Sequence, residues 1–312
     1  MKNIIFITGI LCLFFGNIQA QSWKLNGNNG TVPGTDFIGT TDPAALVFKI
    51  NNIKAGSLEY NSLIANTSFG YQALLSVAGG KFNSAFGSMA LLNNTTGSYN
   101  TATGLGALQY NTMGNYNMAN GLFALGLNTA GSDNTASGSN ALESNTTGNY
   151  NTAQGRFSLR LNKTGYSNAA IGISALYNSS EGHNMVAVGD SALFSQVLGH
   201  NTYDPETGEL LSIDYENTAI GSKSMYSNTS GYNNTATGFR SLYTNTTGSN
   251  NTAAGYMALF NSTANDNTAF GSSALVQNKE GANNTGVGRI ALASNISGNE
   301  NTATGANSLT TN

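Results

Sequence analysis

The 312-residue chain has little charge, almost no proline and a single cysteine. Asp, Glu, Lys and Arg together make up 9% of the residues, against about 25% in ordinary globular domains. Three prolines exclude a Pro-rich linker, and one cysteine excludes a disulfide-held scaffold. The 12 Lys and Arg residues are spread over the whole length, so there is no basic stripe for nucleic acid.

Asparagine, glycine and threonine are the abundant residues, with 46, 38 and 34 copies, more than a third of the chain. The net charge is only −3 and 39% of the residues are hydrophobic, which argues against charge-driven disorder. The composition also excludes a coiled coil and a collagen. It indicates an unusual architecture rather than a particular ligand.

The first 20 residues have the pattern of a signal peptide. Lys2 precedes an apolar run from Ile4 to Phe15, and Ala20 is a small residue suited to cleavage before Gln21. The run is shorter than the roughly 20 residues needed to cross a bilayer, so we expect no integral membrane segment in the mature chain. We therefore expect a protein that is secreted or displayed at the cell surface.

One glycine recurs every 17 residues from Gly70 to Gly189, and again from Gly221 to Gly305 with a single step of 16. We call it the repeat glycine. The gap of 32 residues between the two series equals one period plus an insertion of 15. Fourteen units are visible, and such a period is the signature of a repeat architecture.

Other positions of the unit repeat as strictly as the glycine. Four residues before it stands Asn in thirteen of the fourteen units, with Met185 as the exception. Stacked at strand spacing, these amides can donate to one neighbour and accept from the other. The residue two before the glycine is always small, and the residue four after it is Leu except for Met225. These two columns predict close packing and a continuous apolar ridge.

A second glycine follows ten residues after the first in twelve of thirteen possible units, so two corners with positive φ are expected. Two corners leave two extended segments of roughly 4 to 6 residues per unit. We predict an all-β chain: a parallel β-solenoid, or β-roll, of about fourteen 17-residue coils. Residues 1–20 are the signal peptide, 21–62 a leading β segment, and 63–312 the repeat domain with an inserted hairpin at about 200–216.

The residue just before the repeat glycine is often apolar, as in Phe69, Phe86, Ile171, Ile220 and Phe270. Period-2 alternation places it on the opposite strand face from the small column. Both faces are therefore expected to be partly buried, which a single thin roll cannot arrange alone. This predicts lateral association of several chains.

Two features are candidate ligand sites. The insertion carries Asp204, Glu206 and Glu209 around a turn, and it is either a tolerated surface excursion, a receptor-contacting knob or a cation site. An aromatic column five residues after the repeat glycine either packs against a neighbouring chain or holds sugar rings. Its members are Tyr177, Phe194, Tyr226, Tyr243 and Phe260.

The repeats, for example the unit from Asn100 to Gly114, resemble the head repeats of trimeric autotransporter adhesins (YadA-like heads) and the arrays of bacterial surface fibres and phage tail fibres. The resemblance covers about residues 66–312. It implies a left-handed roll, a homotrimer and a role in attachment to a protein or glycan receptor on a host or environmental surface. The unit is longer than the YadA unit, and no stalk or anchor follows it, so we expect either a fragment or anchoring supplied by another component.

No catalytic constellation is recognised. The two histidines, His183 and His200, fall near corners and are expected to be exposed, and no Cys/His zinc set or phosphate loop is present. We predict a non-enzymatic adhesive fibre head with no catalytic residues, no metal and no cofactor. The alternative is an ice-binding solenoid, because Thr follows the column Asn in most units. A polysaccharide-acting solenoid enzyme is the third and least favoured alternative, because acids and histidines are scarce.

Overall fold

The computed structural model describes residues 38–59, 63–197, 200–203, 210–214 and 216–311, and within these it contains only strands and turns. The chain divides into two units, Met1–Asp42 and Pro43–Asn312, and every strand belongs to the second. The expected all-β class is therefore confirmed. The predicted signal peptide lies outside the described residues.

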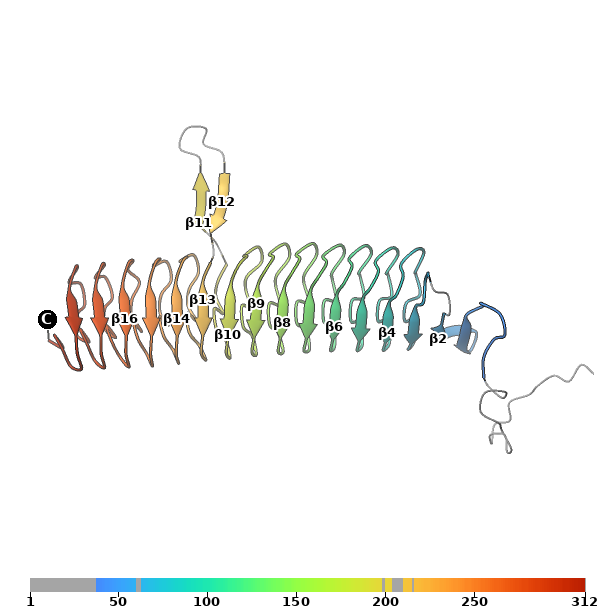
Figure 1. Cartoon of the computed structure of the whole chain (residues 1–312), viewed down its shortest axis with the longest axis horizontal. Coiled ribbons are helices and arrows are strands. Elements are labelled where there is room, and N and C mark those ends of the chain that lie inside the picture. Colours follow the sequence, from blue (N-terminus) through green and yellow to red (C-terminus); the bar gives the residue numbers. More distant parts are fainter. Residues whose placement is uncertain (1–37, 60–62, 198–199, 204–209, 215, 312) are drawn as a thin grey trace, which may run out of the picture. The chain divides into compact units, whose positions relative to one another are not determined.

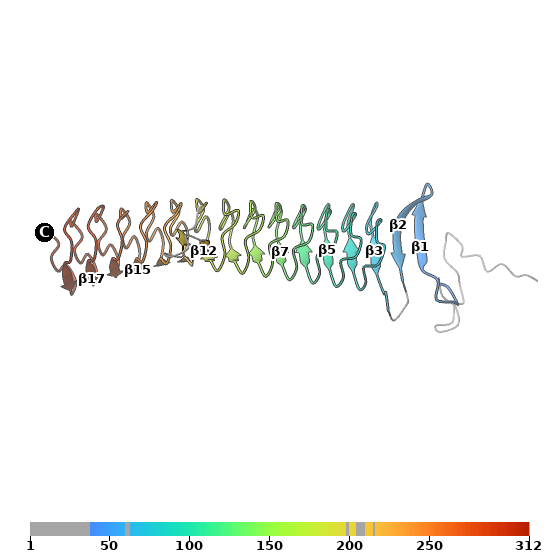
Figure 2. The ribbon, with the colours of Figure 1, turned by 90° about the horizontal axis from the view of Figure 1, so that it is seen from above.

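Fourteen of the strands pair in parallel, one from each coil, in the order of the sequence (Figures 1 and 2). Thr101 pairs with Met118 and Ala102 with Ala119, so identical repeat positions lie side by side. The predicted β-solenoid of 17-residue coils is confirmed. These strands are β3 (Thr67–Phe69), β4 (Ser84–Phe86), β5 (Thr101–Thr103), β6 (Met118–Asn120), β7 (Thr135–Ser137), β8 (Thr152–Gln154), β9 (Ala169–Ile171), β10 (Val186–Val188), β13 (Thr218–Ile220), β14 (Thr235–Thr237), β15 (Thr252–Ala254), β16 (Thr268–Phe270), β17 (Thr285–Val287) and β18 (Thr302–Thr304).

Each coil has one strand of three residues, so the prediction of two extended segments per unit is wrong. The reason lies in the residues two and four after the repeat glycine, which adopt left-handed backbone angles. In one coil these are Asn140 at φ 58° and Leu142 at φ 50°. Left-handed residues interrupt an extended run, so this half of the coil is a series of turns. Its backbone still bonds to the next coil, as when the Leu142 N–H donates to Ser158 O at 3.0 Å.

The repeat glycine is required for two reasons. Gly155 has φ 129°, which side-chain-bearing residues rarely adopt, and a Cβ there would lie 2.6 Å from the Gly172 carbonyl oxygen. Both the angle and the close approach of neighbouring coils exclude a side chain.

The second glycine is needed only for the close approach. A Cβ on Gly131 would lie 2.3 Å from Gly148 O and 2.5 Å from Asn128 Oδ1, yet its φ is not in the left-handed region. The prediction that both corners need positive φ is therefore wrong for this glycine. The neighbouring backbone and an asparagine side chain leave no room for a Cβ at this position.

The core is a thin layer in which the small column faces the leucine ridge. Ala136 and Leu142 are fully buried, like most members of both columns. Gly286 shows what lies against the small column, because a Cβ there would be 3.3 Å from Leu275 Cγ. A larger residue would collide with the ridge, which explains the restriction to Ala, Ser and Gly.

The column of asparagines four residues before the repeat glycine forms the predicted amide ladder, which we call the first ladder. The backbone N–H and the side-chain Nδ2 of Asn134 both donate to Asn117 Oδ1, each at 3.1 Å. Nδ2 also donates to Gly148 O at 2.8 Å. Because these amides are buried, each bond also avoids the cost of an unsatisfied polar group.

A second asparagine ladder, missed in the sequence analysis, runs seven residues after the repeat glycine. Asn128 Nδ2 donates to Asn111 Oδ1 at 2.8 Å, and Asn145 Nδ2 donates to Asn128 Oδ1 at 2.7 Å. Each amide also bonds to the second glycine of its own coil, as from Asn128 to Gly131 O. The two ladders meet at this second glycine, since Asn134 and Asn145 both donate to Gly148 O, and together they hold this corner of each coil to the next coil.

An antiparallel hairpin covers the first coil. Strand β1 (Leu46–Ile50) pairs with β2 (Ile53–Leu58), and β2 pairs antiparallel with β3. The β2–β3 contact includes a buried hydrogen bond between the hydroxyls of Ser57 and Ser68 at 3.1 Å. This hairpin leaves no open β3 edge toward the N-terminal side, where another chain could add a strand.

The insertion contains the predicted hairpin. Strands β11 (His200–Tyr203) and β12 (Leu210–Asp214) pair antiparallel and form a sheet of their own, separate from the solenoid sheet (Figure 1). The parallel sheet passes directly from β10 to β13. The coils therefore continue in register across the insertion.

Candidate binding surface

The five aromatic residues of the candidate column form one continuous stack of half-buried rings. Successive ring centroids lie 5.2, 5.2, 5.4 and 5.2 Å apart, and the ring planes are within 18° of parallel. The sequence placed these rings together correctly. In order along the solenoid they are Tyr177, Phe194, Tyr226, Tyr243 and Phe260.

The rings of this aromatic stack contact one another through their faces. A sugar ring binds an aromatic side chain through a free face, and the three inner rings have none. Packing of the rings within one chain therefore accounts for the column. This is a third role, beside the packing against a neighbouring chain and the sugar binding that were considered from the sequence. Only the ring edges of Phe194, Tyr226 and Tyr243 remain to contact a partner.

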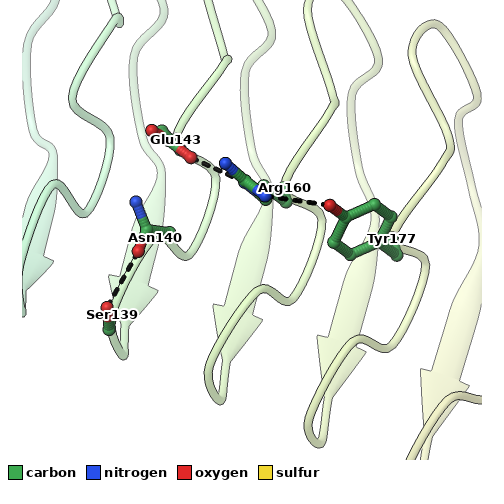
Figure 3. A network of polar contacts seen from close by, with 5 residues as sticks. All are labelled: Ser139, Asn140, Glu143, Arg160 and Tyr177. Carbon is green, nitrogen blue, oxygen red and sulfur yellow. Dashed lines mark hydrogen bonds and ion pairs between the residues drawn. The ribbon is translucent and has the colours of Figure 1, made fainter.

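A polar network precedes the aromatic stack in the same column (Figure 3). Arg160 Nε donates to Glu143 Oε2 at 2.7 Å, and its Nη1 donates to the Tyr177 hydroxyl at 2.9 Å. The hydrogen bond to Glu143 is the main reason that the pKa of Arg160 is raised above its usual value. The charge at this end of the stack is thus neutralised by a carboxylate one coil away.

Phe157, two residues after its repeat glycine, packs against Arg160 and Tyr177 of the same network. The guanidinium of Arg160 lies 4.9 Å from the Phe157 ring centre, and that of Arg156 lies 4.3 Å from it. The Phe157 and Tyr177 rings are nearly perpendicular, with their centroids 6.2 Å apart. This cluster was not predicted from the sequence, although the column that contains the aromatic stack also contains Glu143 and Arg160.

The outer face of the parallel sheet exposes the apolar column just before the repeat glycine. The small column of the same strands is buried, so the alternation is as predicted, but one chain leaves the apolar members uncovered. Their exposed fractions are between 37% and 47%. They are Phe69, Phe86, Ile171, Ile220, Phe270 and Val287.

Threonines form a rank beside this apolar column. In-register pairing aligns Thr218, Thr235, Thr252, Thr268, Thr285 and Thr302 across six consecutive strands. The neighbouring column holds Ile220, Thr237, Ala254, Phe270 and Val287 in the same strands, so it is not uniform. The outer face therefore combines one regular hydroxyl rank with one irregular apolar rank.

The acidic candidates Asp204, Glu206 and Glu209 lie outside the described residues. Only the backbone pairing of β11 and β12 on either side of them is described. His183 was expected to be exposed but is half-buried, with its ring stacked on Tyr166 at 4.7 Å.

In the part of the chain that the structure describes, no three His, Cys, Asp or Glu side chains are grouped as metal ligands would be. The same part contains no helix of the length and apolar character that crossing a bilayer requires.

Comparison with known proteins gives no relative for this chain. No family model, no curated protein and no solved structure matches it.

Proposed function

We propose that the chain is the exported, non-catalytic head of an adhesive fibre, in which three copies associate through the outer face of the parallel sheet. The observation that carries the proposal is the exposed apolar column on that face. Ile220 and Phe270 are 41% and 47% exposed in one chain, on strands whose other face is fully buried. Exposed apolar side chains gathered on one face of a sheet mark interaction sites.

The stacked coils suit a presenting scaffold. Two buried amide ladders and a backbone bonded from coil to coil fix the spacing of surface side chains along the stack. Several weak contacts at fixed spacing, repeated in three copies, raise avidity without a strong single site. The apolar run from Ile4 to Phe15 behind Lys2 supports export.

The experiment uses substitutions that the repeat itself supplies. Ile220→Asn and Phe270→Thr introduce the residues that other coils carry at this position, Asn120 and Thr103, so each coil should still form. The double variant and the parent chain are applied to an array of immobilised glycans and extracellular proteins. We expect the parent to bind at least one class of ligand and the variant to bind it at least about tenfold more weakly through loss of avidity.

Thr237→Ser, in the same column, is the control and should bind like the parent. Equal binding by the double variant and the parent would show that attachment does not depend on this face. Absence of binding to every immobilised surface would contradict the attachment role.

The alternative function is ice binding, favoured by the six aligned threonines from Thr218 to Thr302. An ice-binding face orders water on a flat and regular array of side chains. The irregular column beside the threonines is the reason that this function ranks second. Thermal hysteresis of the purified chain tests it, and Thr252→Val should abolish any hysteresis that is found.

A further inference from the structure

Two cations stand at the same repeat position in successive coils, and one of them lies beside the aromatic stack. Lys223 and Arg240 each stand two residues after their repeat glycine, on coils whose strands β13 and β14 pair in register. The backbone N–H of Arg240 donates to the backbone carbonyl of Ser222 at 3.1 Å, which places the two backbones side by side. At this spacing, about 4.8 Å between strands, the two positive side chains start from neighbouring positions. We call them the cation pair.

Aromatic side chains orient the Arg240 guanidinium. It lies 5.0 Å from the Phe239 ring centre and 5.5 Å from that of Tyr243, a member of the aromatic stack. Its Nε is buried and has no hydrogen-bond partner among the described residues. No acid of the described chain therefore holds this guanidinium through Nε, and because Nε is closed off, its two terminal Nη groups are the ones left to donate to a ligand.

Arg160 gives the comparison within the same molecule. It too lies over aromatic rings beside the stack, but its Nε donates to Glu143 at 2.7 Å. The only ion pairs between described residues are Arg160 with Glu143 and Lys279 with Glu280. Asp190, whose backbone carbonyl accepts the Lys223 N–H, makes no ion pair with either cation. The guanidinium of Arg240 thus lies over aromatic rings as that of Arg160 does, but no carboxylate accepts from its Nε.

We propose that the cation pair is a binding site for an oxyanion group, a carboxylate or a sulfate, supplied by a ligand. Two like charges side by side repel each other, and an anion between them removes that repulsion. The planar guanidinium matches two oxygens of such a group, and the Lys223 ammonium adds a third donor. This site does not depend on the attachment role.

The test is an anion titration followed by NMR of the ¹⁵N-labelled, deuterated full chain. Sodium sulfate and sodium acetate are the two probes, with sodium chloride at matched ionic strength as the baseline. We expect the Arg240 Nε–Hε signal to shift with saturation, and Lys223→Gln to raise the half-saturating concentration about tenfold. Lys223→Arg should keep the parent value.

Arg289→Gln is the matched control, because it removes one exposed cation away from the aromatic stack and should leave the titration unchanged. Saturation by only one of the two anions identifies the group that the site takes. A linear shift of Arg240, as expected for exposed Arg289, would overturn the proposal. A saturating shift that Lys223→Gln does not weaken would also overturn it.

Discussion

Asn217 donates a hydrogen bond from Nδ2 to Oε1 of Gln196 at 3.1 Å, although the whole insertion separates the two residues in the sequence. Asn217 belongs to the first ladder and Gln196 stands at a second-ladder position. Met185 interrupts the first ladder one coil earlier and offers no amide. Gln196, one methylene longer than Asn, accepts from both Asn217 and Asn228 and so joins the ladders where the chain departs into β11 and β12.

Gln196→Leu is expected to destabilise the fold by about 2–4 kcal/mol, because the buried amides of Asn217 and Asn228 each keep their bond to Gly231 O but lose the acceptor of a second N–H. The measurement is the free energy of unfolding from urea denaturation. Gln277→Leu is the control, since Gln277 is exposed and its loss should change stability little. Equal effects of the two substitutions would show that Gln196 does not join the ladders.

Asn134→Asp is expected to make stability depend on pH. The new carboxyl group would be buried and would face Asn117 Oδ1, so its neutral form is favoured and its pKa in the folded state is raised. Such a group binds its proton more tightly in the folded than in the unfolded state. Stability of the variant relative to the parent should therefore fall as pH rises above about 4, and level off beyond the raised pKa. Thermal melting at a series of pH values measures this, and parallel curves for variant and parent would contradict the buried ladder.

Gly155→Ala is expected to cost about 3–5 kcal/mol or to prevent folding, because it combines a strained φ with a collision against Gly172 O. Gly126→Ala is the matched control. Gly126 lies in the column where other coils carry Glu143 or Tyr177, and its φ is not left-handed, so the cost should stay below about 1 kcal/mol. Circular dichroism during heating compares the two variants, and the reverse order of stability would contradict the coil geometry.

The aromatic stack predicts energetic coupling between its members. Tyr226→Ala and Tyr243→Ala each remove one ring from a stacked pair at 5.4 Å, and the double variant should lose less than the sum by about 0.5–1.5 kcal/mol. Tyr226→Ala combined with Tyr110→Ala, at an exposed and separate site, should be additive. Additive effects in the first pair would show that the rings do not stabilise one another.

The sequence predicted the register of the coils because a strict period determines which residues become neighbours. The first ladder, the leucine ridge and the aromatic stack all follow from that register. The backbone angles did not follow, because a leucine such as Leu142 gives no local signal for a left-handed conformation that the neighbouring coil imposes. The second ladder could have been found by applying the same test of periodicity to Asn111 and Asn128.

The candidate sites were predictable to different degrees. Residue types in a column indicated that Tyr226 and Tyr243 would meet, but not that their faces would be covered. The partnerless Nε of Arg240 depends on side-chain orientation and on the absence of a facing acid, neither of which periodicity reveals.

The mass of the purified chain in solution, measured by sedimentation equilibrium, tests whether the exposed apolar column brings several copies together. We expect the mass of three chains for the parent, and a smaller mass for the Ile220→Asn, Phe270→Thr double variant with its circular dichroism unchanged. A parent chain that sediments with the mass of a single copy at all concentrations would show that this column does not bring copies together.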